Sequence, residues 1–501
     1  MADINKAKVL LFNIGPKNTS GYIPMPLLSI ANFLIKGGFE PKIIDTRVFS
    51  QEEVDSEISP ENIKGTLYVA FGVKTGKDIY DALELSKKIK SIKNIPVVWG
   101  GPHASMFPEQ TVENELIDIA VRGEAEGTML ELAQRFSENM PIDDVKGIVF
   151  KNRGKIVSNP LRPFLDINEF GNLPYHLLNL DRYPTKDFFV YETSRGCPFK
   201  CTFCHETIAY NRLSYRGKRP EVVVNEIEHI MKNFSPKYIF ITDDNIFVNK
   251  KRVEAICNGI IEKNLKFEWG GFCRAEYFKN YDDNFLQLLK RSGFVSFALG
   301  GESGSNRILE MIKKEGTVED IMLSAEKCSA AGMEAIYSFM WGFPGETEED
   351  FKQTVDTIRK LWRMKHIKVN GLFTLIPYPG TPLYEQCLKE GYPERKSLEE
   401  WIDFGWSAKA EAERLVWLDK NFRKKALMIG EIVRYVSYRD WLWEKNKGRK
   451  FGVKYLLVSL WKLADLFLYA SLKYRLQNMN LRFPLDIKAW TFIRDRYIGT
   501  F

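Results

Sequence analysis

The sequence lacks any long, uninterrupted apolar run. Its start, MADINKAKVLLFNIG, reaches Pro16 after only a few consecutive apolar residues, too few for the core of a signal peptide. It also lacks low-complexity tracts and internal repeats, while 45% of its 501 residues are hydrophobic and 27% are charged. These features argue against a secreted, disordered or solenoid protein. They predict a cytoplasmic chain that folds into several domains.

Cysteine is scarce, with seven residues in the whole chain. An odd number, in a long chain without a secretion signal, argues against a disulfide framework and for metal or redox use of some thiols. Three cysteines crowd into one short motif. The other four stand singly and are expected to be ordinary buried thiols, because free cysteine packs as a small hydrophobe. They are Cys257, Cys273, Cys328 and Cys387.

The formal charge of +7 is modest for this length, but it is unevenly placed. Residues 411–501 hold 19 Lys or Arg against 9 Asp or Glu, so the rest of the chain is slightly acidic. Nucleic-acid binding is therefore not expected. Within this basic segment, residues 454–476 form an apolar helical face that charges interrupt well before the roughly 20 apolar residues of a membrane span. Two interpretations stay open: a helix packed on the protein, or peripheral contact with an anionic membrane that delivers a lipid-like or isoprenoid substrate.

Residues 1–150 alternate short β-rich runs with helical patterns, which predicts a doubly wound, Rossmann-like α/β domain with a parallel sheet. In such sheets, ligands bind beyond the carboxyl ends of the strands. Those ends read NIGPKNTSG, FGVKTGKD, WGGPHAS and VRGEAEG, and their glycines and small polar residues predict a pocket for a large ligand with polar edges. The expected strands are 8–12, 42–45, 67–73, 96–99 and 118–121.

Residues 151–186 lose this periodicity and contain four prolines, as expected of a linker. Six further β/α repeats then fill residues 187–390, two short of a closed barrel, so we expect an open, partial (β/α)6 TIM-type barrel with its site at the carboxyl ends of its strands. Residues 391–501 are predicted to form a basic, aromatic, mostly helical C-terminal domain. The expected barrel strands are 188–193, 237–242, 267–273, 295–299, 334–340 and 371–376.

The segment RGCPFKCTFCHE follows the first barrel strand and carries Cys197, Cys201 and Cys204. Zinc sites usually pair four ligands that are well separated in sequence, whereas clustered cysteines at spacings of two to four suit an iron–sulfur cluster. Three thiolates leave one iron of a 4Fe-4S cluster without cysteine, open to a substrate or cofactor. The alternatives are a zinc site completed by His205 or by a distant cysteine, and chance clustering of the three cysteines.

This C-x3-C-x-Phe-C motif resembles the signature of the radical S-adenosylmethionine superfamily. The segments FITDDNIFVN, LGGESGSNRILEMIKK, FMWGFPGETEED and LIPYPGTPLYE are similar to that family's second, fourth, fifth and sixth strand segments. The resemblance implies a 4Fe-4S cluster on Cys197, Cys201 and Cys204, with S-adenosylmethionine on the open iron. It also implies an external electron donor such as flavodoxin or ferredoxin, and a 5′-deoxyadenosyl radical that abstracts hydrogen from an unactivated carbon.

By the same resemblance, Phe203 flanks the adenine, Glu302 and Ser303 hold the ribose, and the loops at Gly342 and Pro377 line the nucleoside. Glu302 also reads as a solvated carboxylate at the start of a helix. Three more polar residues at strand ends point into the same mouth, either as pocket residues or as members of structural ion pairs. They are Asp243, Asp244 and Arg274.

The N-terminal domain resembles the cobalamin-binding domain of the branch that couples cobalamin to this chemistry, the class B methyltransferase-like enzymes. The D-x-H-x-x-G loop, whose histidine ligates cobalt in many cobalamin proteins, is replaced by NIGPKN. Candidate cofactor contacts are Val73, Lys74, Thr75, Gly100, Gly101, His103 and Glu124. For His103, a satisfied structural histidine is the equal alternative.

Two readings of the function remain. In the first, cobalamin binds without a protein ligand to cobalt, and the enzyme methylates an unactivated carbon of a lipid-like or natural-product small molecule. In the second, the domain keeps its fold with or without cobalamin, and the enzyme catalyses a cyclisation, rearrangement or carbon–carbon coupling. A third class, an iron–sulfur electron carrier, would need the cysteine motif alone and not the ribose-type and GFPGET segments.

Overall fold

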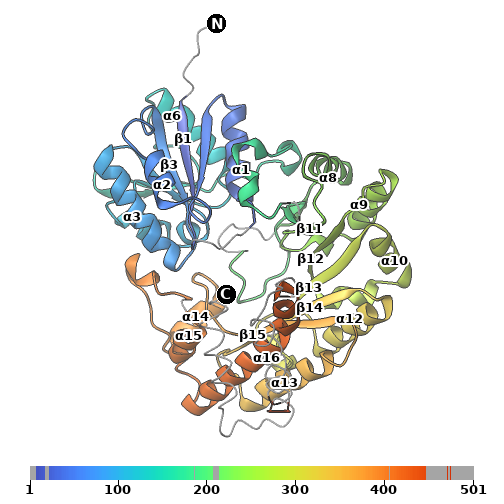
Figure 1. The fold of residues 1–501 in the computed structure, drawn as a ribbon. Coiled ribbons are helices and arrows are strands. Elements are labelled where there is room, and N and C mark those ends of the chain that lie inside the picture. Colours follow the sequence, from blue (N-terminus) through green and yellow to red (C-terminus); the bar gives the residue numbers. More distant parts are fainter. Residues whose placement is uncertain are drawn as a thin grey trace, which may run out of the picture.

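The computed structural model describes residues 7–16, 22–185, 187–206, 214–405 and 407–446, together with residues 471, 474 and 475. Two α/β units lie side by side, and the segment that carries α14 and α15 returns beneath the first of them (Figure 1). Most of the predicted amphipathic segment 454–476 lies outside the described residues. Among the helices that are described, none has the length and apolar character needed to cross a bilayer.

The first unit, residues 7–158, is called the N-terminal unit. Its sheet has the order β2-β1-β3-β4-β5-β6-β7, and its first five strands are parallel. This confirms the predicted doubly wound fold. The strands are β1 (Lys8–Asn13), β2 (Glu40–Asp45), β3 (Thr66–Gly72), β4 (Val97–Gly100), β5 (Ile119–Val121), β6 (Ile148–Asn152) and β7 (Lys155–Ser158). The helices are α1 (Met25–Lys36), α2 (Gln51–Glu57), α3 (Lys77–Ile92), α4 (Pro102–Met106), α5 (Pro108–Glu113) and α6 (Glu126–Ser137).

The antiparallel hairpin of β6 and β7 was not expected from the sequence, and it crosses residue 150, where we placed the first domain boundary. Its turn uses positive φ angles at Arg153 (49°) and Gly154 (79°). The edge strand KIVS is almost wholly exposed, so it lacks the apolar alternation that marks a strand in sequence. The division into 1–150, 151–186, 187–390 and 391–501 otherwise stays a prediction.

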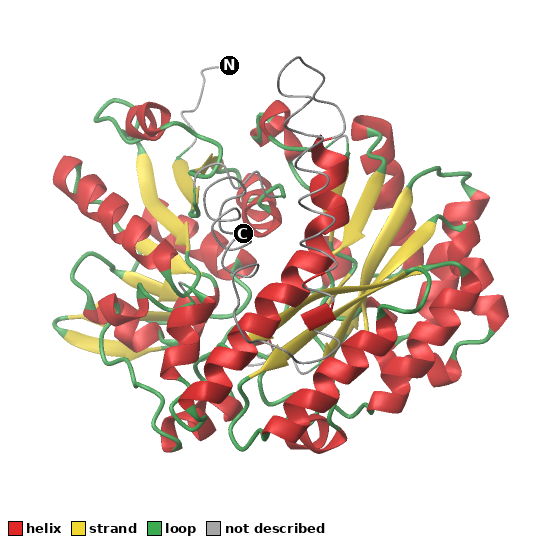
Figure 2. Ribbon diagram, turned by 60° about the horizontal axis from the view of Figure 1, so that its bottom comes forward, coloured by secondary structure: helices red, strands yellow, loops and turns green. Residues whose placement is uncertain are grey.

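The second unit, residues 188–389, is called the barrel unit. Its six strands are all parallel in the order β15-β14-β13-β12-β11-β8, so β8 and β15 form the two ends of an open, curved sheet (Figure 2). The strands are β8 (Phe188–Tyr191), β11 (Tyr238–Ile241), β12 (Glu268–Cys273), β13 (Phe294–Glu302), β14 (Glu334–Trp341) and β15 (Ile367–Thr374). The helices are α8 (Pro220–Phe234), α9 (Lys250–Glu262), α10 (Asp283–Arg291), α11 (Asn306–Met311), α12 (Val318–Ala331), α13 (Glu348–Leu361) and α14 (Pro382–Lys389).

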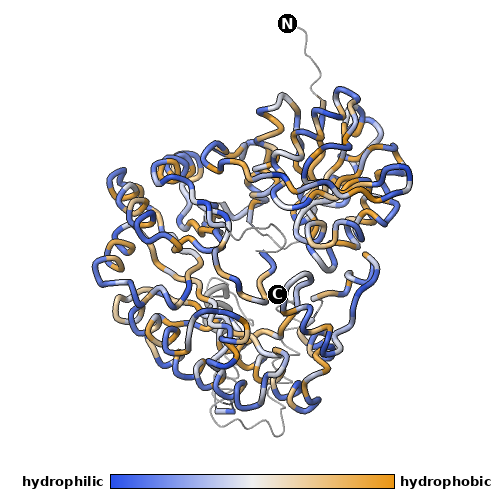
Figure 3. Tube along the Cα trace, turned by 180° about the vertical axis from the view of Figure 1, so that it is seen from behind, coloured by the Kyte–Doolittle hydropathy of each residue, from blue (hydrophilic) through white to orange (hydrophobic). Residues whose placement is uncertain are grey.

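Alternation along the barrel strands decides which side chains face the helices. In β14, Tyr337, Phe339 and Trp341 are buried against the helical layer, while the residues between them are half-buried on the concave side. β15 begins at Ile367, four residues before its expected start. Lys368 and Asn370 interrupt the apolar pattern, so the sequence does not mark these first residues as a strand. Figure 3 shows the resulting distribution, with hydrophobic residues along the strands and hydrophilic ones on the outer helices.

Two C-terminal helices, α15 (Ala408–Arg414) and α16 (Lys420–Asn446), complete the described structure. α16 packs against β15 so closely that a Cβ on Gly430 would lie 3.0 Å from the Leu372 carbonyl oxygen. The preceding segment contacts the N-terminal unit, where the Trp401 indole donates to the Gln110 side chain at 2.8 Å. The C-terminal region therefore joins the two α/β units.

Candidate functional site

The cysteine loop, residues 197–204, follows the short strand β9 (Ser194–Arg195) at the carboxyl end of the first barrel strand. None of the seven cysteines, all of which lie among the described residues, forms a disulfide bond; the three in the cysteine loop are partly exposed, and the four single ones are buried as predicted. Burial raises the pKa of Cys257, Cys328 and Cys387 to about 12, which keeps these thiols protonated. Within the described ranges, no three His, Cys, Asp or Glu side chains are already gathered as a metal site.

The cysteine loop is fixed by backbone contacts from the barrel. The Thr202 N–H donates to the Ile312 carbonyl at 2.9 Å, and the Thr202 carbonyl accepts from the Leu383 N–H at 3.0 Å. At its start, the Gly196 N–H donates to Asp244 Oδ2 at 2.8 Å. The loop thus lies where several strand ends converge, which is the usual place for a site in this architecture.

Two of the three polar residues left without a role also act on this loop. Arg274 Nη1 lies 3.4 Å from Cys201 Sγ, and its guanidinium stacks 3.6 Å from the Phe199 ring centre. Asp243 is buried and accepts from both the N–H and the hydroxyl of Thr193, at 2.6 and 2.5 Å. Arg274 therefore places a positive charge beside one of the sulfurs, while Asp243 anchors the backbone that leads to them.

Glu302 ends β13 in a left-handed conformation, with φ at 59°. A non-glycine residue held there is strained, and such strain concentrates at functional sites. Its carboxylate accepts from Lys314 Nζ at 3.0 Å. Ser303 is buried, with its hydroxyl 3.1 Å from Thr354 Oγ1 and accepting from the Ser305 N–H at 3.1 Å. The two neighbours therefore differ: Glu302 bonds to a lysine, and Ser303 supports the local turn.

The Gly342 loop is held by a residue that sequence reasoning missed. Glu346 Oε2 accepts from the N–H groups of Gly342 and Phe343, the second at 3.2 Å, whereas Oε1 has no hydrogen-bond partner among the described residues. Burial raises the pKa of Glu346 to about 8, against the opposing effect of those backbone donors. Glu346 is the glutamate of the GFPGET segment that the sequence analysis quoted, but only the fold shows that it is buried.

The remaining predicted nucleoside contacts surround the end of the cysteine loop. Phe203 is half-buried against the core, and Pro377 is buried. Next to Pro377, Tyr378 stacks on His205 with ring centres 4.4 Å apart. His205 Nε2 lies 3.1 Å from Glu206 Oε1, so its ring is engaged by two neighbours.

The predicted loops of the N-terminal unit lie against each other. The Val73 N–H donates to the Gly100 carbonyl at 2.9 Å. Gly101 has φ at 93°, and a Cβ at this position would lie 2.9 Å from the Val73 carbonyl oxygen, which is too close. Only glycine fits at position 101. Thr75 belongs to the same group of contacts, while Lys74 beside it is exposed.

His103 follows these glycines and is 0% exposed. Its Nδ1 lies 3.2 Å from Thr75 Oγ1, and its Nε2 has no hydrogen-bond partner within the described part of the chain. The ring packs 6.0 Å from that of Trp401. Burial lowers the pKa of His103 to about 3, so the ring is neutral at physiological pH.

A cavity of about 440 Å³ lies between the two units. One wall is an apolar slot against the N-terminal sheet and α1, formed by Leu11, Leu27, Ala70 and Val98, with Gly100, Gly101 and Gly123 at its edge. The opposite wall belongs to the barrel unit and is charged. It includes Arg195, Lys218, Glu206 and Asp244, so the residues that flank the cysteine loop on both sides line the cavity.

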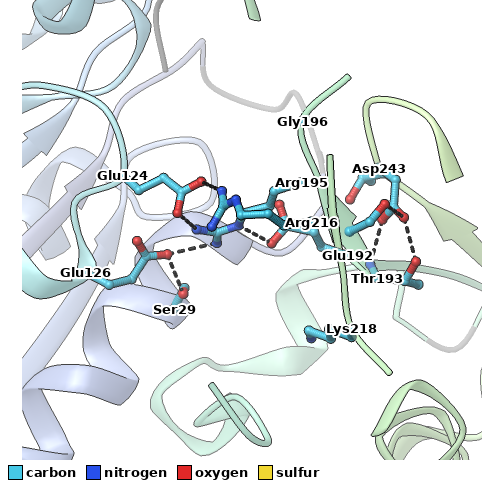
Figure 4. Close-up of polar contacts among 12 residues, drawn as sticks. Ser29, Glu124, Glu126, Glu192, Thr193, Arg195, Gly196, Arg216, Lys218 and Asp243 are labelled. Carbon is cyan, nitrogen blue, oxygen red and sulfur yellow. Dashed lines mark hydrogen bonds and ion pairs between the residues drawn. The ribbon is translucent and has the colours of Figure 1, made fainter. Parts of the chain in front are cut away.

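Arg195, which lines this cavity, forms ion pairs with carboxylates of the N-terminal unit (Figure 4). Its Nη1 pairs with Glu124 Oε2 at 3.2 Å, its Nη2 with Glu126 Oε1 at 2.8 Å, and its Nε with Glu192 Oε2 at 2.8 Å. Arg216 also pairs with Glu124. Burial alone would raise the pKa of Glu126, but the charge and hydrogen bonds of Arg195 lower it to about 2. Of this cluster, sequence reasoning selected only Glu124.

Comparison with known proteins matches both units. Residues 191–358 match the Radical SAM superfamily, and residues 19–133 match the B12 binding domain. An uncharacterized methyltransferase from Pyrococcus horikoshii is 34% identical over 319 residues, which cover 63% of this chain and 68% of that protein. An anaerobic magnesium-protoporphyrin IX monomethyl ester cyclase from Rubrivivax gelatinosus is 26% identical over 387 residues, covering 74% and 67%.

Solved structures share the fold over most of the chain. The radical S-adenosylmethionine methyltransferase TsrM from Kitasatospora setae, with cobalamin and a [4Fe-4S] cluster bound, has a TM-score of 0.67 at 18% identity and covers 83% of this chain and 90% of that one. The cobalamin-dependent S-adenosylmethionine radical enzyme OxsB, with aqua-cobalamin and S-adenosylmethionine bound, has a TM-score of 0.69 at 16% identity and covers 98% and 84%. At these identities the likeness shows a common architecture.

Proposed function

The chain belongs to the radical SAM superfamily, in the branch that carries a B12 binding domain, and from this premise we propose that it is a cobalamin-dependent radical methyltransferase. Its proposed substrate is a lipid-like or natural-product small molecule, which it methylates at an unactivated carbon. One observation carries the proposal. Arg195 and Glu206, which flank the cysteine loop, line the same cavity as Gly100 and Gly101 of the N-terminal unit.

The donor set and the cavity suit the three cofactors of this branch. Three partly exposed thiols on one loop, with the Arg274 guanidinium beside Cys201, suit a cluster with one open iron. The apolar slot beneath Gly100 and Gly101 suits the flat nucleotide tail of cobalamin, because glycine lets a bulky group approach the backbone. His103 is buried against Thr75, which supports cobalamin bound without a histidine on cobalt.

When bound, the cluster supplies the electron that cleaves S-adenosylmethionine, and cobalamin supplies the methyl carrier. The chain binds and orients these groups and excludes water. Arg274 stabilises negative charge on Cys201, and Glu346 fixes the Gly342 backbone against the proposed nucleoside. The proposed ligands and contacts are Cys197, Cys201 and Cys204 for the cluster; Phe203, Glu302, Gly342 and Pro377 for S-adenosylmethionine; and Val73, Lys74, Thr75, Gly100 and Gly101 for cobalamin.

We assign a supporting role to Ser303, His103 and Glu124. Each forms its polar contact within the protein, with Thr354, Thr75 and two arginines respectively. We further propose an external one-electron donor of the flavodoxin or ferredoxin type. Peripheral membrane contact through the basic segment after residue 446 also stays a proposal, supported by the charge of residues 411–501.

The cluster assignment is tested with single alanine variants. Cys197→Ala, Cys201→Ala or Cys204→Ala should abolish iron retention after anaerobic reconstitution and stop cleavage of S-adenosylmethionine. Cys328→Ala, a buried thiol in α12, is the matched control and should keep wild-type iron. If Cys201→Ala kept its iron while Cys328→Ala lost it, the assignment would be wrong.

A ring-forming or rearrangement reaction is the second candidate, favoured by the cyclase relative that matches 74% of this chain. Reaction with methyl-labelled S-adenosylmethionine, reductant and cell-extract fractions separates the two. A methyltransferase places the label in a product detected by mass spectrometry. A cyclase forms 5′-deoxyadenosine and an unlabelled product.

A further inference from the structure

The four residues that lead into the cysteine loop are held from two directions. On the barrel side, Asp243 accepts from the Thr193 N–H at 2.6 Å, and Asp244 accepts from the Gly196 N–H at 2.8 Å. Between these anchors, Arg195 lies in β9, paired in antiparallel register with β10 (Arg216–Gly217). Its side chain leaves the barrel and enters the N-terminal unit (Figure 4). Arg195 therefore links the two units: its backbone belongs to the barrel unit, and its side chain is held by the N-terminal unit.

The guanidinium has little freedom to move. Each of its three nitrogens meets a different carboxylate, from Glu124, Glu126 and Glu192, and its Cζ atom lies 4.9 Å from the Phe170 ring centre. The Arg195 side chain is only 6% exposed, and those of Glu124 and Glu126 are 7% and 5% exposed. A planar, buried, multiply bonded guanidinium is directional in a way that a lysine ammonium is not.

The same carboxylates border the cavity. Glu124 lies in the loop between β5 and α6, Glu126 begins α6, and both line the cavity of about 440 Å³ together with Arg195. A ligand in that space must adjust to these groups, and they hold a residue only two positions before Cys197. Occupation of the cavity and placement of the cysteine sulfurs therefore share one set of contacts.

We propose that Arg195 is a positioning residue that couples the B12-binding unit to the cysteine loop, so that cofactor binding on either side favours binding on the other. The inference rests on the proposed function, because it takes the cysteine loop as the cluster site and the cavity as the cobalamin site. Coupling between two binding sites is reciprocal. Cluster-loaded protein should therefore bind cobalamin more tightly than the same protein without its cluster.

The experiment titrates hydroxocobalamin by absorbance against full-length protein, with the cluster reconstituted and with iron removed by a chelator. We expect wild-type affinity to be at least about fivefold higher with the cluster, the lower end of typical coupling. In Glu126→Gln and Arg195→Lys this ratio should fall to about one, because each variant breaks the three-carboxylate arrangement. Glu53→Gln is the matched control: it removes an ion pair with Arg182 that is 30–39% exposed, and it should keep the wild-type ratio.

The coupling is overturned if the wild-type affinity for hydroxocobalamin is the same with and without the iron–sulfur cluster. It is also overturned if Glu126→Gln and Arg195→Lys both keep the wild-type affinity ratio. Glu126→Gln is isosteric, so it decides the question if Arg195→Lys does not fold. Spectroscopy gives a second readout: the Mössbauer spectrum of the oxidised cluster, with no reductant present, should change on adding hydroxocobalamin to wild type, and not in Glu126→Gln. If wild-type protein binds neither iron nor hydroxocobalamin, the proposed function fails as well; if it binds both independently, only the coupling fails.

Discussion

Replacing Glu346 by glutamine tests whether a buried, protonated carboxyl holds the Gly342 loop. Glu346 follows that loop and accepts hydrogen bonds from the N–H groups of Gly342 and Phe343, and it is 5% exposed. Burial raises its pKa from 4.5 to about 8, so the folded protein keeps the proton at neutral pH. A glutamine amide is also neutral, and its oxygen can accept the same two backbone bonds.

The direction of the pH effect follows from linkage. Below pH 4.5 both states are protonated and this group costs no stability. Between pH 4.5 and about 8 the unfolded chain releases a proton that the folded chain retains, so the free energy of unfolding falls as the pH rises. Between pH 5 and pH 9 this loss amounts to about 4 kcal/mol for wild type, and it is absent from Glu346→Gln.

The assay compares unfolding midpoints of wild type and Glu346→Gln at pH 5, 7 and 9, with matched scan rates. The unfolding midpoint of Glu346→Gln should rise relative to that of wild type as the pH rises. Glu349→Gln, an exposed neighbour in α13, is the control and should follow wild type at every pH. If wild type and Glu346→Gln lost equal stability between pH 5 and pH 9, the carboxyl would be ionised in the folded protein and the reasoning refuted.

Two further predictions concern the proposed cofactor sites. Arg274→Gln removes the positive charge beside Cys201 and should lower the reduction potential of the reconstituted cluster by on the order of 60 mV, about 1.4 kcal/mol, in a redox titration followed by paramagnetic resonance; an unchanged potential would contradict it. Gly101→Ala forces a Cβ within 2.9 Å of the Val73 carbonyl oxygen and should reduce retained cobalamin while iron stays at the wild-type level. Gly154→Ala, also at positive φ but with open space around its Cβ, controls for backbone strain alone, and equal cobalamin loss in both variants would count against the site.

Local patterns in the sequence were enough for the architecture. Short β-rich runs and helical apolar patterns located the first five strands of the N-terminal unit and the six barrel strands, because both reflect the local burial of a single element. The C-x3-C-x2-C spacing of Cys197, Cys201 and Cys204 and its place after a strand were likewise local facts. The sequence analysis missed the exposed edge strand β7 and the polar start of β15, which lack an apolar period. It also missed β6, although Ile148 and Phe150 are buried, because its short apolar run lies at the boundary that we expected between domain and linker.

Tertiary structure alone decided how the polar residues pair. Arg195 and Glu126 are 69 positions apart, and the carboxyl ends of β5 and β8 had to face each other before they could form one buried ion pair. Burial of Glu346 and His103 likewise depends on which elements cover them, and Trp401, from the far end of the chain, packs against His103. The sequence states which charges exist. Which of them lose water and bind one another depends on contacts between distant segments, and no local period records those.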